Sequence, residues 1–247
     1  MKILAFDTSL GSGSAAAADE GGMEERALGA AGDHARLLTA AALDVAERRG
    51  WGSGGNALAG LGPGDVVAVV RGPGSFTGLR VGVTAAKSFA WTSGAGLVGV
   101  CGFGVIARRM ARLDGWSDSP VAIAYDAGRG EVFAAWAQPV ATEALGWRLT
   151  APCLVTFDDW LGSLPPGARI GGPAVDAHRE RITAHGGVVC ASPEVCVSLA
   201  GDAATIARLR ALAGEFDDPH TLVPDYLRPS YAEEARPRAH GSGGPVA

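Results

Sequence analysis

The feature that most constrains the fold is a buried strand that leads directly into a glycine-rich turn and a long helix. Val66 to Val70 is a continuous apolar run dominated by valine, which is typical of a strand buried on both faces of a parallel sheet. A Gly-Pro-Gly turn at 72–74 follows, Ser75 stands where a helix N-cap belongs, and the helical pattern continues to about Ser93. Leu97 to Val100 predicts the next parallel strand. This segment therefore predicts an α/β fold.

A strand followed by an aspartate turn occurs twice in the chain. ILAFDTS at 3–9 and AIAYDAG at 122–128 each contain an apolar strand, an aromatic residue, an aspartate and two small residues. Asp7 and Asp126 lie 119 residues apart, about half the chain, which predicts an internal duplication. Chance similarity between two short strands is the alternative explanation. Two such halves predict two similar α/β lobes whose Asp turns meet at a cleft, as in the actin, sugar-kinase and chaperone ATPase class.

From this pattern we expect an actin-like (ASKHA) fold of mixed sheets flanked by helices. The first lobe is expected at 1–104 and the second at 105–231. The tail at 232–247 is rich in Pro, Gly and Ser, which predicts disorder.

Composition and charge argue against several functions. A net charge of −5 and a pI near 5.5 provide no basic surface for holding nucleic acid directly, so a role in RNA chemistry would need a basic partner. The cysteines form no CxxC pair, which predicts reduced thiols rather than a metal centre. No apolar stretch approaches the roughly 20 residues needed to span a bilayer, and the start does not resemble a signal peptide. We therefore expect a cytoplasmic protein.

The glycine-rich turn fits none of the common phosphate or nucleophile motifs. A Walker A loop needs GK[ST], but Gly78 is followed by Leu79 and Arg80. A dinucleotide fingerprint needs an acid about 20 residues later, and none occurs between Asp65 and Asp114. A nucleophile elbow would need GxSxG. The remaining interpretation is a turn with a packing helix, because small residues recur every four positions and permit close approach of a neighbour: Gly78, Gly82, Ala86 and Ala90.

RGPGSFTGLRVGVTAAKSFA, at 71–90, closely resembles the signature of the TsaB family, which carries GPGSFTGLR followed by an Ile- or Val-Gly step. The signature residues here are Gly72, Pro73, Gly74, Ser75, Phe76, Thr77, Gly78, Leu79 and Arg80. MKILAFDTS, HARLLTAAALDVAERRG, AYDAGRGEVFAAW and PDYLR are similar to other parts of the family. One departure is Gly128, where the family usually has an Arg. The resemblance implies the actin-like fold and a role in making threonylcarbamoyladenosine, the modified adenosine beside the tRNA anticodon.

The resemblance also implies partners. TsaB is a catalytically silent relative of TsaD, the enzyme that transfers the threonylcarbamoyl group to tRNA, and the ATPase TsaE engages the pair. We therefore expect a non-catalytic scaffold or activator subunit that lacks a cofactor or metal of its own, with ATP and metal on the partner subunits. It should contact tRNA only indirectly and form a homodimer when alone. The expected partner interface comprises Gly78, Gly82, Ala86, Ala90, His34 and Leu38. Packing of the small residues against the chain's own helix at 33–49 is the alternative.

An ATP-dependent small-molecule kinase of the same fold is the alternative function. In such an enzyme the two Asp turns would hold phosphates and Mg²⁺, which makes five residues candidates for a residual nucleotide site: Asp7, Thr8, Ser9, Asp126 and Gly128. The same residue types also cap their own turns. A TsaD-type metal site, by contrast, uses two histidines four residues apart, and no His pair in this sequence has that spacing. HExxH is absent as well.

Overall fold

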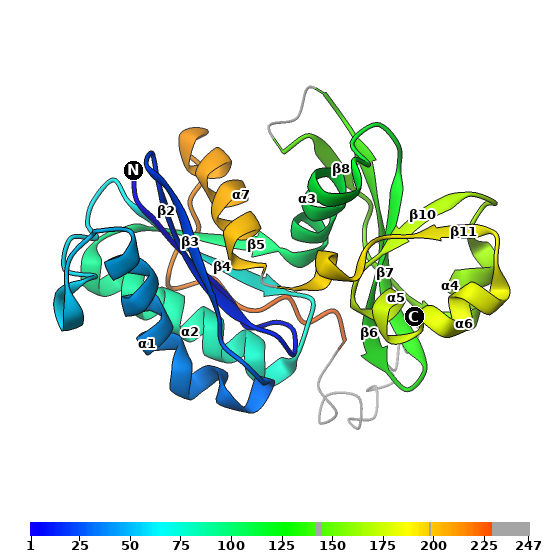
Figure 1. The fold of residues 1–247 in the computed structure, drawn as a ribbon, viewed down its shortest axis with the longest axis horizontal. Helices are drawn as coiled ribbons and strands as arrows, with labels where there is room; N and C mark the ends of the chain where they lie inside the picture. Colours follow the sequence, from blue (N-terminus) through cyan, green and yellow to red (C-terminus); the bar gives the residue numbers. More distant parts are fainter. Residues whose placement is uncertain (142–144, 198, 229–247) are drawn as a thin grey trace, which may run out of the picture.

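The computed structural model describes residues 1–141, 145–197 and 199–228. The chain forms two lobes, each built on one β-sheet (Figure 1). The predicted disordered tail at 232–247 lies outside the described residues. Within the described ranges, no helix is both long enough and apolar enough to cross a membrane.

The first lobe contains a five-stranded mixed sheet in the order β3-β2-β1-β4-β5. Its strands are β1 (Ile3–Asp7), β2 (Ser14–Asp19), β3 (Gly22–Ala27), β4 (Val66–Gly72) and β5 (Gly96–Cys101). Two helices, α1 (His34–Arg48) and α2 (Phe76–Ser93), cover its outer face. β1 is buried throughout: Leu4 and Phe6 pack toward α1 and α2, whereas Ile3 and Ala5 face the middle of the molecule.

The second lobe contains a six-stranded sheet in the order β11-β10-β6-β7-β8, with β9 also paired to β7. Its strands are β6 (Val121–Gly128), β7 (Glu131–Pro139), β8 (Trp147–Leu149), β9 (Cys153–Thr156), β10 (Ala168–Gly171) and β11 (Val188–Cys190). The outer face is covered by α4 (Phe157–Ser163), α5 (Pro173–Ala177) and α6 (Arg179–His185). Three short 3-10 helices complete the described fold: η1 (Ala31–Asp33), η2 (Gly54–Asn56) and η3 (Pro193–Cys196).

The two sheets repeat the same local topology. β1 pairs antiparallel with β2 and parallel with β4, and β6 pairs antiparallel with β7 and parallel with β10. The two Asp turns predicted from the sequence therefore occupy equivalent places at the ends of β1 and β6. The expected α/β fold of two actin-like lobes, with mixed sheets flanked by helices, is confirmed.

Helices α3 (Gly102–Asp114) and α7 (Ala200–Leu212) fill the space between the sheets (Figure 1). α3 contacts β6, β7 and β8, α7 contacts β1, β2, β4 and β5, and the two helices contact each other. One apolar cluster runs through both lobes and both helices. The sequence analysis assigned α7 to the second lobe at 105–231. In the structure it packs on the first sheet, because its alanine-rich face fits closely against the inner side of that sheet.

Candidate functional site

The signature forms the connection between β4 and α2. Ser75 caps α2, and its hydroxyl accepts a hydrogen bond from the Gly78 N–H at 3.3 Å. Gly74 has a φ of 158°, and a side chain there would collide with the backbone of Ser9. Glycine is therefore required at position 74 because the chain passes so close to the turn after β1.

The signature and the first Asp turn form one hydrogen-bonded unit. The Ser75 N–H donates to the Ser9 carbonyl at 2.8 Å. The Thr8 hydroxyl donates to the carbonyl of Gly78 at 2.7 Å. The sequence analysis treated the two motifs separately, but in the fold the first turn of α2 hydrogen-bonds to the turn that follows β1. The N-terminal turn of α2 therefore holds Thr8 and Ser9 in fixed positions.

The small residues of α2 face this unit and the sheet, and not a partner. A side chain at Gly78 or Gly82 would collide with Thr8, and one at Gly82 would also press on Val69 of β4. The other members of the set are likewise buried within the chain: Ala86, Ala90 and Leu38, together with His34. The prediction that these residues form a partner interface is therefore corrected. They are buried inside the first lobe, where the small side chains allow α2 to lie close over β1 and β4.

His34 has a structural role in the described chain. Its side chain is only 1% exposed, and Nε2 accepts a hydrogen bond from the Gly13 N–H at 3.1 Å. This contact joins the start of α1 to the loop between β1 and β2. The imidazole therefore supports the first hairpin from inside the lobe.

Asp7 is sealed inside the protein. Its Oδ1 accepts hydrogen bonds from the Ser9 N–H at 2.9 Å and the Ser9 hydroxyl at 2.6 Å, while Oδ2 is buried and has no hydrogen-bond partner among the described residues. Burial raises the pKa of the Asp7 carboxyl above its ordinary value, and the Ser9 hydrogen bonds oppose the shift. A solvent-borne phosphate or cation cannot reach this carboxylate without opening the turn.

The second Asp turn differs from the first in its surroundings. Asp126 is exposed, and its Oδ1 accepts a hydrogen bond from the Gly128 N–H at 2.7 Å. Gly128 has a φ of 72°, the left-handed conformation that glycine adopts without strain. The preceding residue, Tyr125, is buried against Phe103 with ring centroids 5.1 Å apart. Burial, and then the negative charge of Asp7, raise the pKa of the Tyr125 hydroxyl. The strands before the two turns therefore approach each other in the interlobe core.

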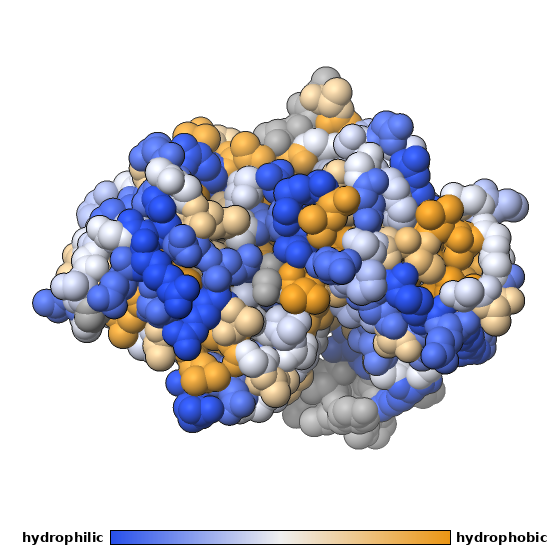
Figure 2. All heavy atoms as spheres, in the orientation of Figure 1, coloured by the Kyte–Doolittle hydropathy of each residue, from blue (hydrophilic) through white to orange (hydrophobic). Residues whose placement is uncertain are grey.

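A polar seam that sequence reasoning missed joins α3 to α7. Asp202 is nearly buried, and its Oδ2 lies 2.9 Å from both Arg109 Nη1 and Arg112 Nη2. Arg108 Nε is 3.5 Å from the other oxygen, and Arg109 also donates to the Glu194 carbonyl at 2.7 Å. Figure 2 shows hydrophilic residues intermixed with hydrophobic ones over the middle of the molecule, between the two lobes. Asp202 and its arginine partners are about 90 residues apart in the chain, so no local sequence motif predicts this seam.

In the described ranges, no three His, Cys, Asp or Glu side chains lie close enough to hold a metal ion together. His178 stacks on Phe157 with ring centroids 4.4 Å apart. Burial raises the thiol pKa of Cys101 and Cys190, which favours the protonated thiol over the thiolate.

Comparisons with known proteins agree with this architecture. The family model described as TsaD, tRNA N6-adenosine threonylcarbamoyltransferase, matches residues 57–218. The tRNA threonylcarbamoyladenosine biosynthesis protein TsaB of Bacillus subtilis (strain 168) is 31% identical over 179 residues, covering 68% of this chain and 71% of that protein.

Two solved structures from Pseudomonas aeruginosa share the fold. One is YeaZ, with a TM-score of 0.71 at 21% identity. The other is described as an uncharacterized protein with similarity to peptidase YeaZ, with a TM-score of 0.73 at 24% identity. In both cases the match covers 92% of this chain and 99% of the other. The resemblance therefore extends over both lobes.

Proposed function

The chain belongs to the TsaB family, and on that premise we propose that it acts in tRNA threonylcarbamoyladenosine biosynthesis as a non-catalytic subunit. In this role it binds and supports the TsaD-type threonylcarbamoyl transferase. The observation that carries the non-catalytic assignment is the sealed first turn. Asp7 is fully buried, and its Oδ1 accepts hydrogen bonds from both the N–H and the hydroxyl of Ser9.

The buried first turn disfavours phosphate binding. Thr8 and Ser9 are also buried, and both hydrogen-bond to the signature segment. Phosphate binding at this turn would have to break these bonds and expose a carboxylate whose pKa is raised by burial. This supports a subunit without a nucleotide or metal of its own, with ATP and metal held by its partners.

The partners follow from family membership and charge. The match to the TsaD family model supports a pairing between two chains of related fold, one of which retains catalysis. The net charge of −5 supports indirect contact with tRNA, through a partner that supplies the basic surface. Engagement of a TsaE-type ATPase, self-association when alone and a cytoplasmic location belong to the same proposal.

Reconstitution with purified components tests the proposal. The full chain, the TsaD-type subunit from the same cell and threonylcarbamoyl-adenylate are combined with tRNA, and modified adenosine is quantified. We expect no product with this chain alone and a clear stimulation of the catalytic subunit when the chain is added. Isothermal titration with Mg-ATP is the parallel measurement. Micromolar ATP affinity with turnover by the isolated chain would favour the kinase alternative and overturn the proposal.

A further inference from the structure

Two buried side-chain oxygens of the interlobe core have no hydrogen-bond partner in the part of the chain that the structure describes. One is Oδ2 of Asp7, which ends β1, and the other is the hydroxyl of Tyr125, near the end of β6. Both side chains are almost completely shielded from solvent. A buried polar group without a hydrogen bond destabilises the folded state, so two such atoms in one core require a physical explanation.

Asp7 and Tyr125 enter the interlobe core from opposite sheets. Side chains alternate between the two faces of a strand, and Asp7 lies on the same face of β1 as Ile3 and Ala5, which belong to that core. Tyr125 is a member of the same core, as is Ile123 two residues before it. The carboxylate of the first lobe and the hydroxyl of the second therefore point into one shared interior.

Two glycines define where the Tyr125 hydroxyl lies. A Cβ atom at Gly102, the first residue of α3, would be 2.7 Å from this hydroxyl and 3.1 Å from the carbonyl oxygen of Gly72. Gly72 ends β4, the strand that runs parallel to β1 in the first sheet. The hydroxyl of the second lobe therefore reaches the end of the first sheet, where Asp7 also lies, and glycine at position 102 leaves room for it.

Electrostatics agree with this placement. Burial raises the pKa of the Tyr125 hydroxyl, and the negative charge of Asp7 is the next largest cause, ahead of Cys196 and Cys101. A charge acts most strongly on its near neighbours. Because Oδ1 of Asp7 already accepts two hydrogen bonds from Ser9, Oδ2 is the oxygen that is left for a contact across the lobes.

A single water molecule satisfies both atoms. The Tyr125 hydroxyl donates to the water oxygen, and the water donates one hydrogen to Oδ2 of Asp7. The carbonyl of Gly72 is close enough to the hydroxyl to accept the other hydrogen, which gives the water about three partners, the usual number for a buried water. A hydrogen bond through water is nearly as favourable as a direct one.

Two other arrangements suit the site less well. A metal cation requires more oxygen ligands than these, and the surrounding core consists of apolar side chains such as Val70, Val100 and Phe103. A direct hydrogen bond between the hydroxyl and the carboxylate is not formed among the described residues. It would require the two sheets to move closer together, which the close packing of a protein interior resists.

We propose that Asp7 and Tyr125 hold one buried water molecule, which forms a hydrogen-bonded link between the two lobes at the ends of β1 and β6. The link lies inside this chain and is independent of the proposed pairing with a catalytic subunit. It supplies a directional contact within an otherwise apolar interlobe core and thereby favours one orientation of the lobes, because a satisfied buried polar network specifies a unique packing.

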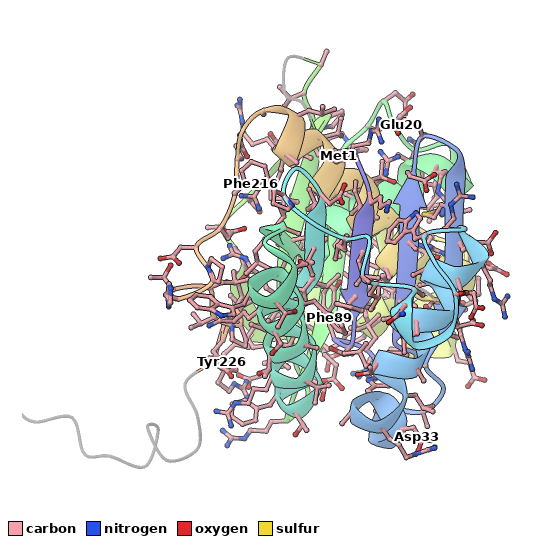
Figure 3. All side chains as sticks on the ribbon, turned by 90° about the vertical axis from the view of Figure 1, so that its left-hand side faces the viewer. Met1, Glu20, Asp33, Phe89, Phe216 and Tyr226 are labelled. Carbon is pink, nitrogen blue, oxygen red and sulfur yellow. The ribbon has the colours of Figure 1, made fainter. Side chains whose placement is uncertain are left out.

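The first test is Tyr125→Phe in the full chain, which removes only the hydroxyl oxygen. If the hydroxyl is bonded to Asp7 through water, its loss should raise the equilibrium constant for unfolding, measured in urea, by about fivefold or more. Removal of an unpartnered hydroxyl would leave stability unchanged or increase it, and that result overturns the proposal. The matched control is Tyr226→Phe, at an exposed position of the first lobe (Figure 3), which should change the constant by no more than about twofold.

A double-mutant cycle with Asp7→Asn tests the link itself. Asparagine keeps an oxygen for Ser9 but replaces the charged Oδ2 by an amide nitrogen. The effect of Tyr125→Phe on the unfolding constant should therefore be at least about threefold smaller in the Asp7→Asn chain, whereas Tyr226→Phe should have the same small effect in both chains. Additive effects of Asp7→Asn and Tyr125→Phe would show that the two groups do not interact, and the proposal would be wrong.

A high-resolution crystal structure of the wild type identifies the occupant. We expect one peak of electron density within hydrogen-bond distance of both Asp7 Oδ2 and the Tyr125 hydroxyl, with the few partners of a water molecule, and we expect it to be lost or displaced in Tyr125→Phe. A direct contact between the two atoms with no peak between them would contradict the proposal. So would a peak surrounded by the closer and more numerous oxygen ligands of a cation.

Discussion

Gly82 lies where α2 crosses the turn after β1, and the space beside it is already occupied by Thr8 and Val69. For Gly82, the sequence predicts a close neighbour but not which residue that neighbour is. Small residues spaced by four positions indicate a close neighbour, and this inference was correct. The identity of the neighbour depends on the contact between Thr8 and Gly78, 70 residues apart, which no local pattern contains.

Gly82→Leu should therefore destabilise the chain. The added side chain would collide with Thr8 and force α2 away from the sheet, and overpacking of this kind typically costs about 1–3 kcal/mol. Thermal and urea unfolding measure the effect. Thr84→Leu, at an exposed position of the same helix, is the control and should unfold close to the wild type. An unchanged midpoint for Gly82→Leu would show that the helix can shift without cost.

The raised pKa of Asp7 predicts that the free energy of unfolding depends on pH. Burial raises the pKa of its carboxyl in the folded chain, so the folded state holds this proton more tightly than the unfolded state. The resulting stabilisation is complete below the ordinary Asp pKa, roughly 4, and is lost as pH rises through the folded value.

The substitution Asp7→Asn removes the titrating carboxyl group. The free energy of unfolding of Asp7→Asn, relative to the wild type, should therefore increase from acidic to neutral pH. Urea unfolding at a series of pH values measures the difference, with Asp126→Asn in the exposed second turn as the control. A difference that falls with increasing pH would contradict the assignment of a raised pKa.

At the scale of elements, local signals located most of the first lobe. The valine run predicted β4, the N-cap at Ser75 and the helical pattern to Ser93 match the bounds of α2, and Leu97 to Val100 lies within β5. The placement of α7 was not predictable, because its pairing with the first sheet joins residues more than 180 positions apart, such as Ser14 and Ala200. Sequence order alone placed this helix within the range of the second lobe, whereas it packs on the sheet of the first.

The seam between α3 and α7 provides an element-scale prediction. Asp202→Ala would leave Arg108, Arg109 and Arg112 around a nearly buried site without their carboxylate. Removing one partner of a buried ion pair costs roughly 3–5 kcal/mol, so unfolding should occur at a much lower urea concentration. Asp118→Ala removes an exposed partner of Arg169 and should change stability little. Equal effects of the two substitutions would mean that the seam adds nothing beyond a surface ion pair.

At the scale of the whole molecule, the lobes are not independent. The interlobe core contains strands of both sheets together with α3 and α7. The segment after α7 returns to the first lobe, where Asp217 forms a bridge with Leu97 and Asp225 binds Arg71. The first sheet is therefore completed by residues from the end of the described chain, and the two lobes share the burial that stabilises each of them.

This arrangement predicts that the fragment 1–104 cannot fold alone. Without α7, the inner face of its sheet would expose apolar residues that are fully buried in the intact chain: Ile3, Ala5, Val66, Ala68 and Val70. At about 25 cal/mol per Å² of apolar surface, this loss exceeds the margin of a small lobe. Joining 1–104 through a flexible linker to 199–228 restores the missing helix and should recover a cooperative transition. Circular dichroism melts and amide NMR dispersion compare the two fragments with the full chain. A cooperative melt and dispersed spectrum for 1–104 alone would show that the first lobe carries its own complete core.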